Sequence, residues 1–303
     1  MISAQIGRAA ASALVLAAGA MLAAQGGRVG LPTPSRAMPV RLPPIKLATG
    51  SGLTDLPLPS GPFFDIVAYG ALAGGDAVAN QQAINDAIAA AAAAGGGTVV
   101  VPAGDFRTYT IRLKSRVGLH LSTRTSILRA AVAGVGEGQD GGFYDAPEPN
   151  PFVGLQDHGH SHWANSLIYG DDVEDVMISG PGLIDGSRLD SRGETIGVLS
   201  TGDPREVATR TDGGAPGGGN KAIALKNARR IVFRDFSIKN GGHFAILGTG
   251  VVGWTIDHII VDTNRDAFDI DASQNVTVRN SVFNSLTDDA LVLKASFGLG
   301  KAM

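Results

Sequence analysis

Three acidic residues near the end of the sequence have the spacing that acid–base chemistry requires. Asp266 and Asp289 lie 23 positions apart, and Asp288 stands beside the second of them. If the chain is built from coils of this length, the two positions coincide on successive coils, where adjacent strands lie only about 4.8 Å apart. Like charges crowded in this way raise the pKa of at least one carboxyl group, which gives a proton donor beside a proton acceptor. Such a pair can cleave a glycosidic bond.

An internal repeat of apolar segments indicates coils of that length. Similar triplets end at Ile178, Phe233, Ile256 and Val278, and the last three are spaced by 23 and then 22 residues. A second series, consisting of Phe244–Leu247, Phe268–Asp271 and Leu291–Lys294, is spaced by 24 and then 23 residues. A third series is formed by 167–169 and 223–225, which lie ten residues before the first.

Short strands that recur at this period predict a parallel β-helix, in which each coil buries its inward side chains against the coils above and below it. A leucine-rich repeat has a similar period, but its Leu-x-x-Leu-x-Leu pattern is missing here. Residues 80–94 predict the one convincing helix, capped by Asn80 and ended by Gly95. This helix would cover the N-terminal end of the coil, which otherwise exposes unpaired strand edges.

The composition excludes several classes of protein. The chain has 303 residues and a formal net charge of -3, and 17% of its residues are charged. Without a basic excess to neutralise phosphates, nucleic acid is not expected as a partner. The absence of cysteine excludes disulfides, thiolate metal sites and a cysteine nucleophile. The 42 glycines have no triplet period and indicate a fold with many tight turns.

Residues 1–24 have the features of a secretory signal peptide. Arg8 precedes an almost charge-free apolar run, Ala9–Ala24, which contains the small residues Ala18-Gly19-Ala20 as a candidate cleavage site. The run is shorter than the roughly 20 residues that cross a bilayer, so an uncleaved anchor is the less favoured interpretation, as is a buried alanine-rich helix. Residues 25–62 are rich in Pro and Gly and predict an extended linker. We expect a secreted or periplasmic protein that is not attached to the membrane after cleavage.

Two motifs around the aspartates resemble a known family. The segment Asn264-Arg265-Asp266-Ala267-Phe268-Asp269 is similar to the Asn-Thr-Asp-Gly-Phe/Ile-Asp signature of the polygalacturonases, glycoside hydrolase family 28. The segment from Thr287 to Lys294 is similar to the family's Asp-Asp-Cys-Ile-Ala-Ile-Lys signature, and it lies at the expected distance. Residues 67–70, 96–104 and 178–186 are also similar to the family, so the resemblance covers about residues 63–298.

The resemblance implies an all-β fold, a right-handed parallel β-helix of the pectin-lyase-like solenoid type with an N-terminal capping helix. It also implies hydrolysis of α-1,4 galacturonide links in pectin with inversion, by a monomer that needs neither cofactor nor metal. Asp288 would be the general acid, and Asp266 and Asp289 would position and deprotonate the attacking water. The candidate substrate-binding residues are Asn264 and Lys294. For Lys294, an ion pair with Asp271 one coil away is an equal alternative.

The sequence departs from the family in two respects. Arg265 replaces the usual Thr and Ala267 the usual Gly, which reshapes the pocket and leaves the preferred polysaccharide open among homogalacturonan, rhamnogalacturonan and xylogalacturonan. The family's Gly-His-Gly and Arg-x-Lys motifs do not follow Asp289. We therefore expect residues 63–303 to be the N-terminal and central part of the domain, with the C-terminal coils missing, and the chain alone to be weakly active or inactive.

The sequence offers other candidate site residues and two rival functions. Three histidines occur at alternate positions, His158, His160 and His162. Alternate residues of a strand share a face and could bind zinc together, but we favour the interpretation that this segment is a loop lining the sugar cleft. Trp163 is a candidate sugar-stacking residue, with an ordinary packed aromatic favoured over it. The rival functions are a Ca²⁺-dependent, pectate-lyase-like β-eliminase, whose acidic cluster would bind metal, and a non-catalytic carbohydrate-binding β-helix.

Overall fold

The computed structural model describes residues 57–152, 160–190 and 217–301. These residues belong to one structural unit, residues 55–303. The predicted signal peptide and almost all of the predicted linker lie outside the described residues, as does His158. Within the part of the chain that is described, no helix has both the length and the apolar character needed to cross a membrane.

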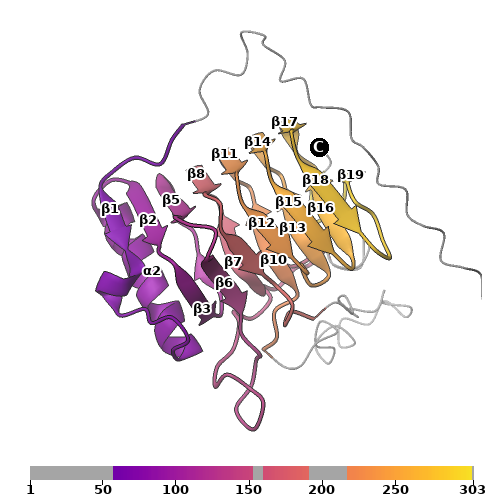
Figure 1. The fold of residues 1–303 in the computed structure, drawn as a ribbon. Helices are drawn as coiled ribbons and strands as arrows, with labels where there is room; N and C mark the ends of the chain where they lie inside the picture. Colours follow the sequence, from indigo (N-terminus) through magenta and orange to yellow (C-terminus); the bar gives the residue numbers. More distant parts are fainter. Residues whose placement is uncertain (1–56, 153–159, 191–216, 302–303) are drawn as a thin grey trace, which may run out of the picture. The chain divides into compact units, whose positions relative to one another are not determined.

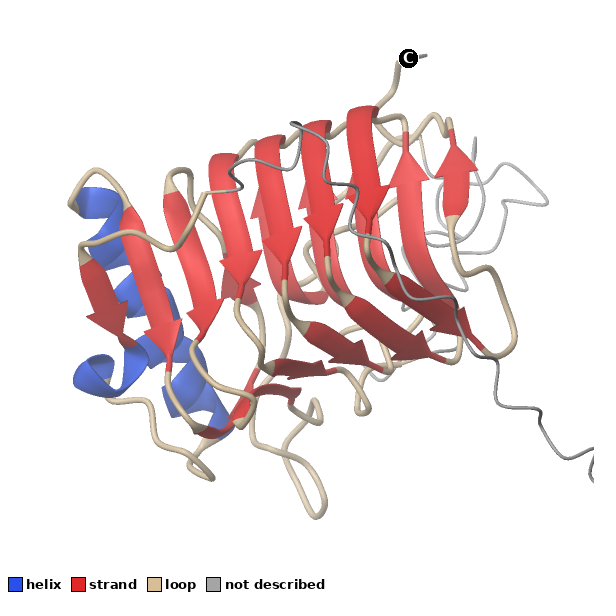
Figure 2. Ribbon diagram, turned by 45° about the horizontal axis from the view of Figure 1, so that its top comes forward, coloured by secondary structure: helices blue, strands red, loops and turns tan. Residues whose placement is uncertain are grey.

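The described strands form three parallel sheets (Figures 1 and 2). Sheet A contains β1 (Phe63–Asp65), β2 (Gly97–Val101), β5 (Val117–Leu121), β8 (Glu174–Ser179), β11 (Arg229–Arg234), β14 (Val252–Asp257) and β17 (Gln274–Arg279). Sheet B contains β3 (Gly104–Thr108), β6 (Ser126–Ala130), β9 (Leu183–Asp185), β12 (Ser237–Lys239), β15 (Ile260–Thr263) and β18 (Val282–Ser285). Sheet C contains β4 (Ile111–Arg112), β7 (Ser166–Asp171), β10 (Lys221–Lys226), β13 (Phe244–Thr249), β16 (Asp266–Asp271) and β19 (Val292–Lys294).

Strands that follow one another in the sequence belong to different sheets, and strands that are paired lie about one repeat apart. For example, β13, β14 and β15 lie in sheets C, A and B, and the next three strands pair with them in the same order. Each coil thus adds one strand to each sheet, which is the parallel β-helix that the repeat predicts. The fold prediction is confirmed.

The pairing register confirms one predicted series and corrects another. Phe233 pairs with Ile178 and with Ile256, and Ile256 pairs with Val278. In sheet C, however, Phe268 pairs with Ile246 rather than with Phe244, so the spacing of 24 residues was wrong by two. A slip of two residues keeps every side chain on the same face, so the apolar pattern alone does not detect it.

The structure also shows which sheet the sequence pattern missed. The segments 167–169 and 223–225 belong to sheet C, together with the second series, and do not form a separate sheet. The actual third sheet is sheet B, in which strands β12 and β15 are three and four residues long and each bury a single apolar side chain, Ile238 and Val261. One apolar residue per strand is too weak a signal to reveal a period.

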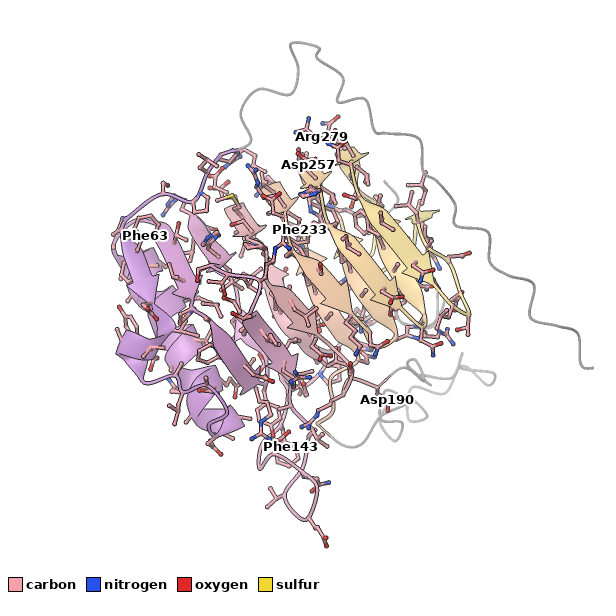
Figure 3. The ribbon with its side chains drawn as sticks, viewed as in Figure 1. Phe63, Phe143, Asp190, Phe233, Asp257 and Arg279 are labelled. Atoms are coloured by element: carbon pink, nitrogen blue, oxygen red, sulfur yellow. The ribbon has the colours of Figure 1, made fainter. Side chains whose placement is uncertain are left out.

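Inward side chains of successive coils stack along the axis and form the core. Phe233 lies inside the coil (Figure 3), and its ring meets that of Trp254 edge to face with 5.3 Å between centroids. The ring of Trp254 contacts Phe268 in the same way at 4.9 Å. Burying a large apolar side chain contributes roughly 1.5–3 kcal/mol to stability, and Trp254 is fully buried. Outside the coil, Asp257 and Arg279 pair across β14 and β17 at 3.2 Å (Figure 3).

The coils turn at residues in the left-handed backbone region. Between sheets C and A these are Asp172, Asn227, Gly250 and Ala272, with φ of 51°, 51°, 71° and 45°. Asn, Asp and Gly tolerate this conformation, and Ala does so at a cost. This backbone conformation explains why glycine, asparagine and aspartate recur at the turns of the repeat.

The N-terminal end of the coil is covered by helix α2 (Ala77–Ala93), as predicted (Figure 1). The short 3-10 helix η1 (Ile66–Tyr69) precedes it. The predicted cap was wrong: Asp76 caps α2 by accepting a hydrogen bond from the backbone N–H of Ala79 at 2.8 Å. Asn80 lies inside the helix, where its buried side chain bonds to Leu72 and to the carbonyl of Arg107. Asn80 therefore connects the helix to the coil by hydrogen bonds and does not cap the helix.

Candidate active site

The structure brings Asp266, Asp288 and Asp289 together at one end of sheet C. Asp266 begins β16, and the other two lie in the turn before β19. The pairing of Asp269 with Val292 places position 289 beside position 266 on the following coil. One carboxylate oxygen from each of the three lies within 4.8 Å of the others. We call these three residues the aspartate cluster.

Backbone hydrogen bonds hold the cluster in place. The N–H of Asp289 lies 3.2 Å from Oδ1 of Asp266 and 3.2 Å from Oδ1 of Asp288, so it is shared between the two carboxyl groups. The N–H of Ala267 donates to the carbonyl of Asp289 at 3.0 Å. The carboxyl groups of two coils are therefore positioned by main-chain groups and not by side-chain packing alone.

The surroundings of Asp266 raise its pKa to about 7. Burial contributes most, followed by the negative charge of Asp269, while a hydrogen bond from the N–H of Asp289 acts in the opposite direction. The charge of Asp288 and a hydrogen bond with its carboxyl group add to the rise. Two carboxyl groups can share a hydrogen bond only through a proton, so the cluster holds one proton at mildly acidic pH.

A buried group of polar side chains lies behind the cluster. Asp269 is fully buried on β16, and its Oδ1 lies 3.2 Å from Nε2 of His160. Nδ1 of His160 lies 3.5 Å from Nζ of Lys294, so the imidazole accepts from the ammonium and donates to the carboxylate. Burial raises the pKa of Asp269, and the hydrogen bond from His160 opposes this rise. The histidine run gave no indication of this link to the aspartates.

The two predicted substrate-binding residues occupy different surroundings. Asn264 is exposed, and its carbonyl accepts hydrogen bonds from the N–H and Oγ1 of Thr287 at 3.0 and 2.6 Å, which joins the turns before β16 and β19. Lys294 pairs in register with Asp271, as predicted, and its ammonium contacts His160. The carboxylate of Asp271 accepts from the N–H of Ser296 at 2.7 Å and from its hydroxyl at 2.5 Å.

Arg265 is a site residue that sequence reasoning treated only as a change of pocket shape. Its Nη2 lies 2.8 Å from Oδ2 of Asp288, and both side chains are about one-third exposed. A signal for this contact was present: Arg265 and Asp288 are 23 positions apart, the same spacing that brings Asp266 next to Asp289. A cation one repeat away from an acidic residue predicts an ion pair across adjacent coils.

Trp163 and His162 lie in the segment that precedes β7 of sheet C. Trp163 is 1% exposed, packs on Phe244 and Leu247, and donates from Nε1 to Oγ1 of Thr249 at 2.9 Å. The packed-aromatic interpretation was therefore correct. Nδ1 of His162 bonds to the carbonyl of Glu148 at 2.7 Å, so the two described histidines of the run have different partners.

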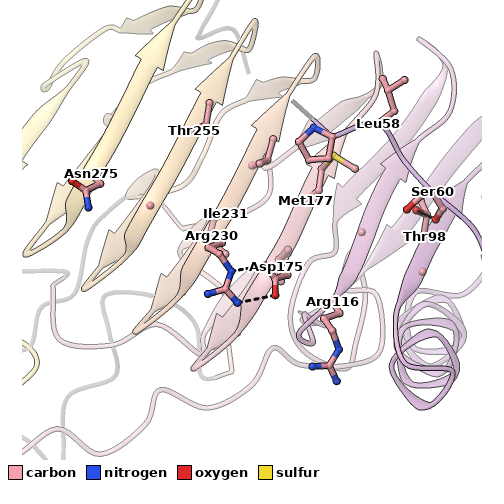
Figure 4. A pocket seen from close by; sticks show the side chains of 16 residues that line it. Leu58, Ser60, Thr98, Arg116, Asp175, Met177, Arg230, Ile231, Thr255 and Asn275 are labelled. Atoms are coloured by element: carbon pink, nitrogen blue, oxygen red, sulfur yellow. Dashed lines mark hydrogen bonds and ion pairs between the residues drawn. The ribbon is translucent and has the colours of Figure 1, made fainter. Parts of the chain in front are cut away.

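A separate groove of about 510 Å³ lies on the outer face of sheet A (Figure 4). Its floor includes Thr98, Met177 and Thr255, and it contains Asp175 and Arg230. Figure 4 shows these two joined by hydrogen bonds of 2.6 and 2.8 Å. Because the Asp175 carboxylate is paired with Arg230, the groove lacks the crowded carboxyl groups that the aspartate cluster provides.

Comparison with known proteins relates the chain to others through its structure. No protein-family model matches the sequence, and no curated protein sequence matches it. An exopolygalacturonase from Thermotoga maritima is similar in structure, with a TM-score of 0.58 and 19% identity over 80% of this chain and 56% of its own. A polygalacturonase from Erwinia carotovora gives a TM-score of 0.55 and 19% identity over 80% of this chain and 60% of its own.

A candidate glycosyl hydrolase from Parabacteroides merdae is also similar, with a TM-score of 0.54 and 18% identity over 77% of this chain and 96% of its own. The chain thus spans nearly all of this protein, but less than two thirds of the two polygalacturonases. At these identities the likeness concerns the fold. The chain has the parallel β-helix fold of polygalacturonases and related glycoside hydrolases.

Proposed function

We propose that this protein is a polysaccharide hydrolase that cleaves α-glycosidic bonds of galacturonan or pectin. The observation that carries the proposal is the aspartate cluster: one oxygen from each of three carboxyl groups lies within 4.8 Å of the others, and burial together with neighbouring negative charge raises the pKa of Asp266 to about 7. A cluster that holds a proton near neutral pH beside further carboxyl groups contains the acid and the base that glycosidic cleavage needs. The shared fold and the two sequence motifs support the choice of substrate.

The reaction proceeds by attack of water with inversion. A protonated aspartate donates to the leaving glycosidic oxygen while the other two hold and deprotonate a water molecule on the opposite side of the sugar. A hydrogen bond from water to a carboxylate spans about 2.7–2.8 Å, so one water can bridge two oxygens that are up to 4.8 Å apart. The family resemblance assigns the donor to Asp288 and the water to Asp266 and Asp289. Asn264 is exposed beside the cluster and is our candidate for contact with substrate.

The experiment that tests the proposal is incubation of the protein with polygalacturonate in the presence of a calcium chelator. We expect new reducing ends and no ultraviolet absorbance from unsaturated sugars. The nuclear magnetic resonance spectrum of the first product should show the inverted anomer. Asp288→Asn should abolish activity, whereas the control Asp172→Asn should not, because Asp172 is exposed at a turn whose φ of 51° asparagine adopts readily.

Two outcomes would contradict the proposal. An unsaturated product that disappears with the chelator would identify a calcium-dependent β-eliminase, since three clustered carboxylates are also suitable calcium ligands. Binding of polygalacturonate without any bond cleavage, unchanged in Asp288→Asn, would identify a carbohydrate-binding protein.

A further inference from the structure

The polysaccharide proposed as substrate is an anion, and the aspartate cluster is acidic. Each galacturonyl unit that is not esterified carries one carboxylate. Cleavage at the cluster brings this carboxylate close to Asp266, Asp288 and Asp289, of which one oxygen each lies within 4.8 Å of the others. Like charges placed side by side oppose binding. A cation beside the cluster offsets this repulsion and favours the charged sugar over a neutral one.

Arg265 is a cation in contact with the cluster. It directly precedes Asp266, and its Nη2 lies 2.8 Å from Oδ2 of Asp288 on the following coil. The side chains of Arg265 and Asp288 are both about one-third exposed, so a ligand can reach the guanidinium from solvent. A guanidinium stays protonated in proteins, so the positive charge beside the cluster does not depend on pH.

The ion pair with Asp288 leaves donors of Arg265 available. A guanidinium carries five N–H donors in one plane, and Nη2 faces Asp288. Among the described residues, none bonds to the buried Nε of Arg265, and none bonds to Nη1, which is not buried. The two N–H groups of Nη1 thus face solvent beside the cluster. The planar fork of an arginine matches the geometry of a carboxylate, which can bind to two of its N–H groups at once.

Other basic side chains near the cluster are directed elsewhere. The ammonium of Lys294 lies 3.5 Å from Nδ1 of His160, in the buried group behind the cluster. Lys221 and His243 belong to the preceding coils and are 0% and 4% exposed. Among these described residues, Arg265 is therefore the cation that combines an ion pair to the cluster with exposure to solvent.

We propose that Arg265 binds the carboxylate of the galacturonyl unit at the cleavage site and thereby selects galacturonan that is not esterified at this unit. The inference rests on the proposed hydrolase function and names the substrate class of the same site. It is independent of which aspartate donates the proton. The family motif has threonine at this position, so the resemblance does not imply this contact.

The test is a binding titration with two trisaccharides that differ only at C6 of each sugar, trigalacturonate and the neutral α-1,4-galactotriose. Both are added to the Asp266→Asn protein, which should not cleave them, and the backbone N–H signal of Asp289 in the NMR spectrum reports binding at the cluster. We expect trigalacturonate to bind more tightly. Adding Arg265→Gln should weaken its binding about 10- to 100-fold, as loss of a hydrogen bond between charged groups does, and should leave galactotriose binding unchanged.

Two further variants make the comparison specific. Arg265→Lys keeps the charge without the fork and should lose part of the preference for trigalacturonate. Arg279→Gln is the matched control, because Arg279 also pairs with an aspartate on the neighbouring coil, Asp257, and also has a buried Nε without a hydrogen-bond partner among the described residues, but lies on sheet A. It should change neither affinity.

Equal affinity of the two trisaccharides for the protein with Arg265 would overturn the inference, as would an equal loss of both affinities in Arg265→Gln, which a purely structural role would produce. If Arg265→Gln does not fold, Arg265→Lys decides, because an unchanged preference would contradict the inference. A protein that prefers trigalacturonate through Arg265 but releases no reducing ends from polygalacturonate would contradict the proposed function and support this inference. A protein that hydrolyses polygalacturonate while Arg265→Gln keeps the full preference would do the reverse.

Discussion

The backbone N–H of Asp289 donates to the carboxyl group of Asp266, which occupies the same position one coil earlier, over 3.2 Å. The same N–H lies 3.2 Å from the carboxyl group of Asp288. A single main-chain group thus links the candidate proton donor to the candidate base. Its position depends on the register of β16 and β19, so the spacing of the carboxyl groups is a property of the fold itself.

The first prediction concerns activity. Asp266→Asn should lower the rate of polygalacturonate hydrolysis by about 10²- to 10⁴-fold, because an amide can neither donate nor accept the proton that moves in the reaction. The measurement is the rate of appearance of reducing ends, compared with the control Asp172→Asn. Retention of more than a tenth of the wild-type rate would show that Asp266 takes no direct part in proton transfer.

The second prediction concerns stability and pH. The pKa of Asp266 is raised to about 7 in the folded protein, so between about pH 4 and pH 7 the folded state binds a proton that the unfolded state has lost. Below about pH 4 the residue is protonated in both states and does not change the free energy of unfolding. As the pH rises towards 7 it becomes destabilising. A shift of about three pKa units corresponds to about 4 kcal/mol at most, and solvent screening of this half-buried group reduces the effect to about 1–3 kcal/mol at pH 8.

Denaturant unfolding at several pH values checks this expectation. Asp266→Asn should gain stability relative to the wild type as pH rises from 4 to about 7, and the difference should then level off. Parallel curves for the two proteins would mean that the folded environment does not perturb Asp266.

The third prediction concerns packing inside the coil. A Cβ at Gly248 would lie 2.1 Å from a ring carbon of Trp254, so Gly248→Ala should destabilise the protein by about 1–3 kcal/mol or more. Gly118→Ala is the matched control, because a Cβ on this strand glycine has its nearest contact at 3.5 Å. Thermal unfolding should show a lower Tm for the first variant and little change for the second. Equal Tm values would indicate that the Trp254 ring shifts without cost.

The fourth prediction concerns the turn between sheets C and A. Ala272 has a φ of 45°, whereas its counterparts one and two coils earlier are Gly250 and Asn227. Ala272→Gly should raise the free energy of unfolding by about 0.5 kcal/mol, since glycine adopts this conformation without steric cost. Ala267→Gly, in the buried part of strand β16, should be destabilising. If both variants lose stability equally, the backbone at Ala272 is not strained.

Much of the fold could be predicted from the spacing of similar residues in the sequence. The period of about 23 residues was sufficient to predict coils, parallel strands and the proximity of Asp266 to Asp289, because a strand that pairs with its counterpart one repeat later brings equivalent positions together. The same reasoning misjudged the start of α2, where Asp76 rather than Asn80 provides the cap. Ala77, Val78 and Ala79 carry no periodic signal that would have extended the helix.

Contacts between residues that the repeat does not relate could not be predicted from the sequence. His160 reaches Asp269 from 109 positions earlier in the sequence, and no period relates the two. Arg265 illustrates the intermediate case, in which the spacing to Asp288 was visible but the direction of the side chain was not.

The sequence by itself determined the coil period, the fold class and the meeting of the three aspartates, because these follow from residues repeated at a constant interval along a solenoid. Only the tertiary structure decided which carboxyl group has the raised pKa. The pKa of Asp266 depends on how deeply its carboxyl group is buried and on which charges surround it, and these are set by the register of neighbouring strands and by side chains that the repeat does not relate.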